Sequence, residues 1–174
     1  MDIQVIDAKP EHVEGIQEVF YRVWLDTYPN AGSGVTVEDV EDRFKSRLSE
    51  KILEKRKQQI MHLDSTEKFL VALDGAKVVG LCRATKGDKE HRLTAIYVLP
   101  EYQRKGIGTA LWNKVKDFFV PPGDILVGVA TYNQGAIDFY SKLGFKDTGR
   151  RYTEERHRMQ SGAILPQMDM RLSR

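Results

Sequence analysis

Cysteine is almost absent from this sequence, and neither sign of charge dominates. Cys82 is the single cysteine among 174 residues, which excludes an internal disulfide and makes a reducing cytoplasm the expected location. The 27 basic and 25 acidic residues leave a formal charge of +2, so there is no bulk field for nucleic acid. The four histidines and the cysteine lack the spacing of metal ligands, and we therefore expect no metal site.

Long apolar runs are missing as well. None approaches the ~20 residues that a membrane-spanning helix needs, and Met1-Asp2-Ile3 does not begin a signal peptide. We therefore expect no membrane partner. The chain also has no internal repeat, low-complexity tract or Gly/Ser linker, which predicts a single domain over residues 1–174.

What the sequence does contain is a strand, a glycine-rich loop and a helix within residues 93–119. The short apolar run at residues 93–99 predicts a strand buried on both faces, ended by Pro100. Apolar residues then recur at helical spacing, which predicts a helix from Ile107 with one buried stripe. The stripe consists of Leu111, Val115 and Phe118, with Ala110 and Phe119 beside it.

The loop between them, Gln103-Arg104-Lys105-Gly106-Ile107-Gly108, has the properties of an anion site. The first amides of a helix have no intrahelical partner, and glycine lets a phosphate approach the backbone. Two basic residues add positive charge, so a diphosphate is the expected ligand. A tight turn uses the same glycines without any ligand, and that alternative stays open. Leu111 stands at the third glycine position of the dinucleotide pattern, which argues against dinucleotide binding.

Periodicity and turn residues predict the remaining elements. Strands are expected at residues 3–8, 68–73, 77–85, 125–131, 145–154 and 167–172. Helices are expected from Pro10, from Thr36 with a break near Ser49, and from Asn133 to Gly144. Asp74-Gly75 predicts a hairpin. Residues 45–57 form a basic run, which we interpret as a solvated helix face rather than a nucleic-acid patch.

Two blocks of this sequence carry a resemblance to a known family. The first is Tyr97-Val98-x-Pro100-x-Tyr102-Gln103-Arg104-Lys105-Gly106-Ile107-Gly108, and the second is Asn133-Gln-Gly-Ala136-Ile137-Asp-Phe-Tyr140-Ser-Lys142-Leu-Gly144-Phe145. The first resembles the acetyl-CoA signature of the GNAT superfamily of N-acetyltransferases, and the second resembles that superfamily's other common motif. The resemblance covers about residues 68–145. It implies an α/β (α+β) fold with a mixed, mostly antiparallel sheet, helices on both faces and a splayed central strand pair.

The resemblance also implies a cosubstrate, acetyl-CoA, and the residues that bind it. These are Ile96, Tyr97, Val98, Gln103, Arg104, Lys105, Gly106, Ile107, Gly108, Thr109 and Asn133. Ile96 and Val98 would act through their backbone, and Asn133 has a second interpretation as a helix N-cap.

Tyr140 matches the tyrosine that serves as general acid in this superfamily. Its phenol, of pKa about 10, stays protonated at neutral pH and can stabilise a leaving thiolate whose pKa is about 8.5. On position alone, packing in a helix stripe is the alternative.

The general base and the acceptor pocket are less defined. Many relatives carry a glutamate where this chain has Arg92 and Thr94, so we consider Glu90 or His91 acting through water. An acyl-cysteine route through Cys82 is not expected. Such folds place the acceptor between the first helical region and the last hairpin loop. Here that offers Trp24, Asp26, Tyr28, Tyr152, Glu154, Glu155 and Ser161.

The sequence therefore predicts an N-acetyltransferase in which a primary amine attacks directly in a ternary complex. A small-molecule acceptor, of the polyamine or amino-sugar type, is the leading expectation. Acetylation of a protein N-terminus or lysine is an alternative, and Arg92 and Thr94 keep open a non-catalytic acyl-CoA-binding regulatory module. Many relatives pair through sheet edges, which makes a homodimer a further expectation. The length of the acyl group stays open.

Overall fold

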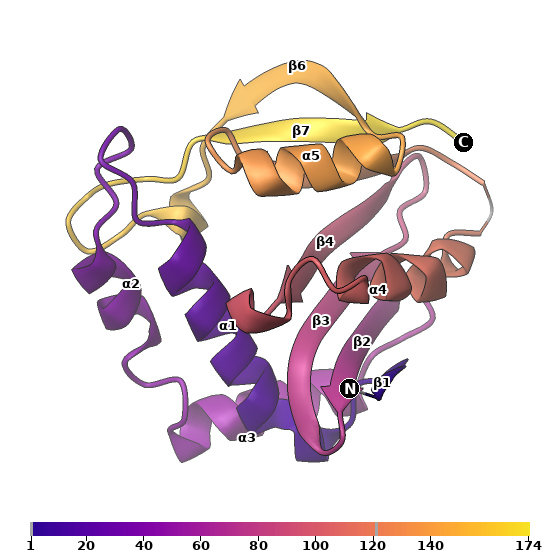
Figure 1. Ribbon diagram of the computed structural model, residues 1–174, viewed down its shortest axis with the longest axis horizontal. Coiled ribbons are helices and arrows are strands. Elements are labelled where there is room, and N and C mark those ends of the chain that lie inside the picture. Colours follow the sequence, from indigo (N-terminus) through magenta and orange to yellow (C-terminus); the bar gives the residue numbers. More distant parts are fainter. Residues whose placement is uncertain (1, 121) are drawn as a thin grey trace.

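The computed structural model describes residues 2–120 and 122–174, and one seven-stranded sheet runs through that part of the chain (Figure 1). Its strand order is β1-β2-β3-β4-β5-β7-β6. The strands are β1 (Ile3–Asp7), β2 (Glu67–Asp74), β3 (Lys77–Thr85), β4 (His91–Val98), β5 (Ile125–Ala130), β6 (Lys146–Tyr152) and β7 (Gln167–Leu172). The predicted strands are thus confirmed to within a few residues at each end.

The sheet divides at its centre. Neighbouring strands are antiparallel except β4 and β5, which are parallel. That parallel pairing joins only His91, Arg92 and Leu93 of β4 to Ile125, Leu126 and Val127 of β5. Beyond Leu93 the two strands separate, so the splayed central pair is confirmed.

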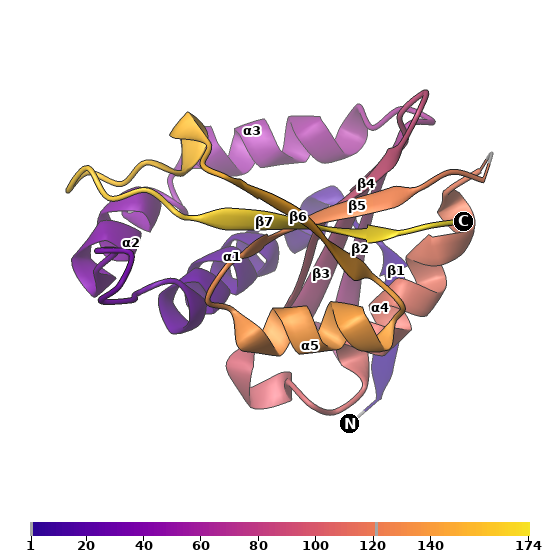
Figure 2. The same ribbon diagram turned by 90° about the horizontal axis from the view of Figure 1, so that it is seen from above.

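Helices cover both faces of the sheet. They are α1 (Val13–Thr27), α2 (Val37–Phe44), α3 (Glu50–Met61), α4 (Ile107–Val115) and α5 (Gln134–Lys142). Figure 2 shows α3 on one side of the sheet and α4 with α5 on the other. The ring of Phe20 in α1 meets the edge of Tyr97 in β4, with 5.6 Å between the ring centroids. In the described residues no helix is both long and apolar enough to cross a membrane.

The local signals at helix and strand ends act as the sequence predicts. Thr36 and Asp39 cap α2 reciprocally, each side chain accepting the other's backbone N–H at 3.1 Å. The side chain of Asn133 accepts the amide of Ala136 at 3.1 Å and so begins α5. After α5, Gly144 adopts φ +96°, the left-handed conformation that ends a helix.

Two packing predictions need correction. Phe119 is fully buried and Phe118 is only half-buried, because the chain tightens into a 3₁₀ turn over Lys116–Phe118 and shifts the phase of the stripe. The strand at β4 is not buried on both faces. Leu93 and Ala95 are buried, whereas Thr94 is exposed at the point where β5 departs.

Candidate active site

The separation of β4 from β5 leaves an open strand edge within the sheet. Thr94 is the extra residue of a bulge, since Arg83 of β3 pairs with Ala95 and the next residue, Ala84, pairs with Leu93. Past the bulge, the Val98 carbonyl accepts the side-chain amide of Gln103 at 3.1 Å. The backbone of Ile96 hydrogen-bonds the phenol of Tyr140. Side chains, rather than β5, thus occupy this edge of β4.

The glycine-rich loop presents amides next to that edge. Ala110 donates to the carbonyl of Gly106 at 2.9 Å, so the amides that precede Ala110 have no partner inside α4. Gly106 has φ +83° and Arg104 has φ +59°, a left-handed conformation that is uncommon for arginine. A Cβ at Gly108 would lie 3.2 Å from the ring of Phe139 in α5. The loop therefore forms a cradle of amides without intrahelical partners, beside the two basic residues Arg104 and Lys105.

Tyr140 projects from α5 toward the same strand edge. Its residue is 5 % exposed and packs against the rings of Phe139 and Phe145. Burial raises the pKa of Tyr140 well above its ordinary value, and the nearby Cys82 and Tyr97 act in the same direction. The hydrogen bond from the backbone of Ile96 has the opposite, smaller effect on that pKa. The phenol is therefore a proton donor held in an apolar setting. Burial also raises the pKa of the Cys82 thiol, which makes it a poor nucleophile.

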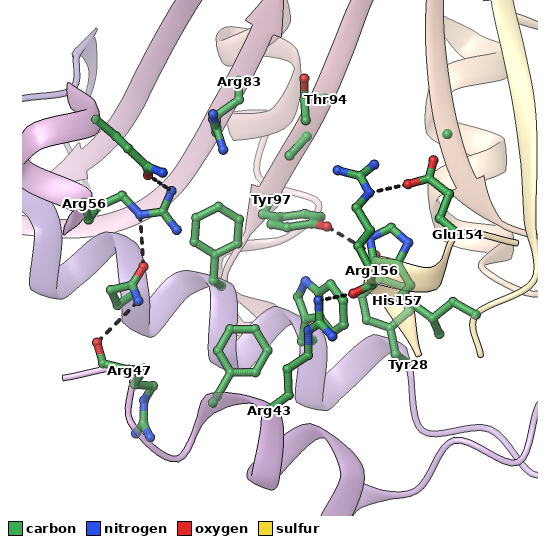
Figure 3. Close-up of a pocket in the computed structure, with 18 of the residues that line it drawn as sticks. Tyr28, Arg43, Arg47, Arg56, Arg83, Thr94, Tyr97, Glu154, Arg156 and His157 are labelled. Atoms are coloured by element: carbon green, nitrogen blue, oxygen red, sulfur yellow. Dashed lines mark hydrogen bonds and ion pairs between the residues drawn. The ribbon is translucent and has the colours of Figure 1, made fainter. Parts of the chain in front are cut away.

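A cavity of about 510 Å³ lies on the other side of β4, between the helices α1 to α3 and the β6–β7 connection. Figure 3 shows Tyr97 at its centre, with Arg56 and Arg83 on one side and Arg156 and His157 on the other. The described residues that line it carry six arginines and one lysine but a single carboxylate, Glu154. The cations are Arg43, Arg47, Lys55, Arg56, Arg83, Arg92 and Arg156. The cavity is therefore strongly cationic.

Some of these arginines are neutralised by nearby carboxylates. Arg92 lies 3.6 Å from the buried Asp169, and Arg47 donates to Glu18 at 3.2 Å. Arg156 pairs with Glu154.

The arginines at positions 43, 56 and 83 have no ion pair within the part of the chain that the structure describes. Arg43 instead donates to the Arg156 carbonyl at 2.8 Å and lies over the Trp24 ring. Net positive charge thus remains in the cavity.

Hydroxyl and imidazole groups complete the lining. The phenolic oxygens of Tyr28 and Tyr97 lie 3.2 Å apart, and enclosure raises the pKa of both phenols. The Nδ1 atom of His157 lies 3.1 Å from Oε1 of Gln167. Burial, followed by repulsion from Arg156, lowers the pKa of His157, so this imidazole is neutral at pH 7.

The acceptor residues predicted from the sequence divide into two groups. Trp24, Tyr28, Tyr152 and Glu154 line the cavity, as expected. Three others do not, namely Asp26, Glu155 and Ser161. The hydroxyl of Ser161 donates to Asp39 at 2.7 Å, and Glu155 pairs with Arg158 at 2.7 Å. These two side chains are turned away from the cavity because they stabilise the loop that carries them.

The candidates for a general base are also separated. Arg92 and Thr94 both line the cavity. They stand at the two positions compared above with a glutamate of the family, so neither position supplies a carboxylate. Glu90 and His91 are not among the described residues that line it. His91 is buried, with its ring 5.5 Å from that of Phe119. The geometry therefore gives no support to Glu90 or His91 as a base.

Sequence reasoning missed the arginine cluster. Its members come from α2, the α2–α3 connection, α3, β3, β4 and the β6–β7 connection, and no spacing along the chain links them. Part of the basic run at residues 45–57, interpreted as a solvated face, in fact turns Arg47, Lys55 and Arg56 toward the cavity. No helical spacing could have signalled this grouping, because Arg47 lies in the turn between α2 and α3 while Lys55 and Arg56 lie in α3.

Comparison with known proteins identifies relatives along most of the chain. The sequence pattern of the acetyltransferase (GNAT) family matches residues 19–145. An uncharacterized N-acetyltransferase of Mycobacterium tuberculosis is 35 % identical over 91 residues, which cover 51 % of this chain and 58 % of that protein. N-acetyltransferase 8F1 of Rattus norvegicus is 31 % identical over 99 residues, which cover 52 % of this chain and 45 % of that protein. The chain thus spans about half the length of these curated relatives.

A solved structure extends the similarity to the whole fold. The crystal structure of the PaiA N-acetyltransferase of Thermoplasma acidophilum, in complex with coenzyme A, superimposes with a TM-score of 0.73. The two chains are 24 % identical, and the match covers 100 % of each. At that identity the match establishes the shared fold.

Proposed function

Because this chain belongs to the acetyltransferase (GNAT) family, we propose that it transfers an acetyl group from acetyl-CoA to a primary amine of a small molecule. The observation that carries the proposal is the meeting of three features at one gap. The open edge of β4, the amide cradle before α4 and the phenol of Tyr140 all face the place where β4 leaves β5.

The residues present fit acetyl-CoA. The cradle of residues 103–109 suits the diphosphate, since its amides have no intrahelical partner and Gly108, at which a Cβ would meet the Phe139 ring, lets the start of α4 pack closely against α5. The backbone of Ile96 and Val98 suits pantetheine, which has amide groups able to add to a strand edge. The side-chain amide of Gln103 now donates a hydrogen bond to the Val98 carbonyl, so it would move away when pantetheine binds. The side chain of Asn133 already caps α5, and a contact from it to pantetheine remains a secondary proposal.

When bound, acetyl-CoA supplies a thioester whose acyl carbon accepts the amine and whose sulfur leaves. Tyr140 is our proposed general acid. Its raised pKa keeps the phenol protonated, so it can donate a hydrogen bond that strengthens as charge collects on the sulfur. The backbone amide of Val98 is the proposed donor to the thioester oxygen.

The arginines also bear on the protonation state of the acceptor. A free alkylamine of pKa about 10.4 is neutral in only about one molecule in 2,500 at pH 7. Nearby guanidinium groups disfavour the ammonium form and so lower the pKa of a bound amine. This effect supplies neutral amine without a carboxylate at Arg92 or Thr94, and the neutral imidazole of His157 lies in the same cavity to accept a proton.

The same charge bears on the choice of acceptor. A polyamine or amino sugar, the acceptor favoured by sequence, carries several positive charges and would meet the net positive charge that Arg43, Arg56 and Arg83 leave in the cavity. We therefore propose that the small-molecule acceptor is not a polycation. Acetylation of a protein amino group is less favoured, because the cavity's volume of about 510 Å³ is that of a small-molecule site.

The test is thiol release from acetyl-CoA with a panel of amino acids, phosphorylated amines, aminoglycosides, polyamines and N-terminal peptides, with a no-acceptor control. Release that depends on one amine class supports the proposal. Binding of acetyl-CoA without release for any acceptor would overturn it and favour the non-catalytic regulatory module.

A further inference from the structure

Arg56 and Arg83 are two cations of the cavity whose close contacts are all neutral. Nε of Arg56 donates to Gln17 at 3.2 Å and its Nη1 donates to Gln59 at 3.0 Å. Arg83 lies over the ring of Phe69, 5.3 Å from the centroid. Neither has an ion pair among the residues described, although Glu67 acts on Arg83 from a longer distance. The two guanidinium charges are therefore held in place without being neutralised.

These two charges also repel each other. Burial, and then repulsion from Arg83, lowers the pKa of Arg56 to about 10, while burial lowers the pKa of Arg83. Arg56 projects from α3 and Arg83 from β3, and both lie on the same side of Tyr97 (Figure 3). Two half-buried like charges are unfavourable unless an anion joins them. The arrangement is therefore complementary to an oxyanion.

We infer that Arg56 and Arg83 form a subsite for a carboxylate or phosphate of the acceptor, which is therefore a small primary amine that also carries an acidic group. The inference rests on the proposed function, since it names the substrate class of the same site. Guanidinium groups bind both oxyanions through paired N–H donors, so the structure specifies the charge and leaves the oxyanion's identity to experiment.

The position of the subsite favours a small acid over an acidic peptide. Both arginines line the cavity of about 510 Å³, a volume typical of small-molecule sites. Tyr97 lies between this subsite and the group formed by Arg156 and His157 (Figure 3). An acceptor with its acid at one side of Tyr97 would hold its amine close to β4, where the strand edge opens.

The test compares acceptors that differ in one charge. Amino acids are measured against their amides, and phosphoethanolamine against ethanolamine, with spermidine and an Asp/Glu-rich N-terminal peptide as further arms. Thiol release gives kcat and KM, and calorimetry in the presence of CoA gives acceptor binding without turnover. We expect the acid of at least one pair to have a KM at least tenfold below that of its neutral partner, the effect of losing one charged hydrogen bond.

Two variants test whether Arg56 and Arg83 cause the preference for the acidic acceptor. Arg56→Gln and Arg83→Gln should each raise the acid's KM and Kd about tenfold or more and change the neutral partner's values by a clearly smaller factor. Arg151→Gln removes the same charge from an ion pair with Asp147 outside the cavity lining, and it should change neither. Arg56→Lys and Arg83→Lys keep the charge and should recover part of the preference, which separates charge loss from misfolding.

The outcomes are distinct. Equal KM and Kd for acids and their neutral partners would overturn the inference and leave the proposed function standing. Preferred turnover of spermidine would overturn both the inference and the exclusion of a polycation, and would leave acetyl transfer to a small amine standing. Turnover of the acidic peptide alone would overturn the small-molecule class. If no amine releases thiol, the proposed function fails, and calorimetry still decides whether the two arginines bind the acids.

Discussion

The phenolic oxygens of Tyr28 and Tyr97 lie 3.2 Å apart and join the end of α1 to the part of β4 that has left β5. Because the two groups share one hydrogen bond, removing either hydroxyl loses the same interaction. Tyr28→Phe and Tyr97→Phe should each lower the free energy of unfolding by about 1 kcal/mol. The double variant should lower the free energy of unfolding by clearly less than the sum of the two single losses, as measured by urea unfolding. Strictly additive losses would contradict the coupling.

Tyr140→Phe should lower kcat about 100-fold or more and leave the Kd for acetyl-CoA within about twofold. The phenyl ring retains the packing against Phe139 and Phe145 and loses only the proton donor. Tyr21→Phe, on α1 and outside the cavity lining, is the matched control and should keep full activity. Steady-state rates measure kcat, and calorimetry measures the Kd for acetyl-CoA. An unchanged kcat would show that Tyr140 is not the general acid.

The pH dependence of the wild-type rate offers an independent check. Burial raises the pKa of Tyr140, so its phenol stays protonated as the pH rises through the ordinary phenol range near 10. We therefore expect no loss of kcat from phenol ionisation between about pH 7 and pH 9. A fall in that range that Tyr140→Phe abolishes would show that the phenol ionises there.

Gly108→Val should weaken CoA binding about a hundredfold or more while the chain still folds. A Cβ at this position already lies 3.2 Å from the Phe139 ring, so the larger side chain displaces the start of α4 from α5 and disturbs the amide cradle. A hundredfold is the effect of losing about two charged hydrogen bonds. Gly135→Ala is the control, because the nearest atom to its Cβ is Oδ1 of Asn133 at 3.8 Å. CoA affinity by calorimetry, with circular dichroism for folding, decides the matter.

Asp39 should make stability depend on acid pH. Its carboxylate accepts the backbone N–H groups of Thr36 and Ser161, each at 3.1 Å, and the Ser161 hydroxyl at 2.7 Å. Burial opposes the charged form, but these hydrogen bonds outweigh it and lower the pKa. A folded-state pKa below the unfolded value of about 3.9 contributes stability above that pH and loses it as the pH falls through the folded value.

Asp39→Asn should therefore lower the free energy of unfolding by about 1–2 kcal/mol at pH 7. The difference from wild type should narrow below about pH 4, as followed by urea unfolding across pH. Asp138→Asn, on the exposed face of α5, should match the wild type at both ends of the range. A gap that stays constant with pH would exclude the carboxylate's charge as the cause.

Local chemistry made much of the fold predictable. The reciprocal cap of Thr36 and Asp39, the turn at Asp74-Gly75 and the left-handed Gly144 each depend on neighbouring residues, so the sequence carries them directly. Phe118 was misplaced because a 3₁₀ turn, which depends on how the helix end packs, changes the period of the stripe.

The candidate site was predictable only where a motif is contiguous. Gln103 to Thr109 form one continuous segment at the start of α4, so their order along the chain also groups them in space. Arg56 and Arg83 line one cavity although they come from α3 and β3, a relationship between distant segments that no spacing reveals. For the same reason, Asp26 and Ser161 could be placed near the pocket and yet fail to line it.

The short contact between β4 and β5 has a mechanical consequence. Three residue pairs join the antiparallel unit β1–β4 to the unit of β5, β7 and β6, and the rest of that boundary has no ladder. Each unit keeps the hydrogen bonds between its own strands. Hydrogen exchange should therefore show two units that unfold cooperatively, with the contact between β4 and β5 opening first. A ligand that inserts along this seam would bond to both units at once, and its binding energy would then oppose their separation.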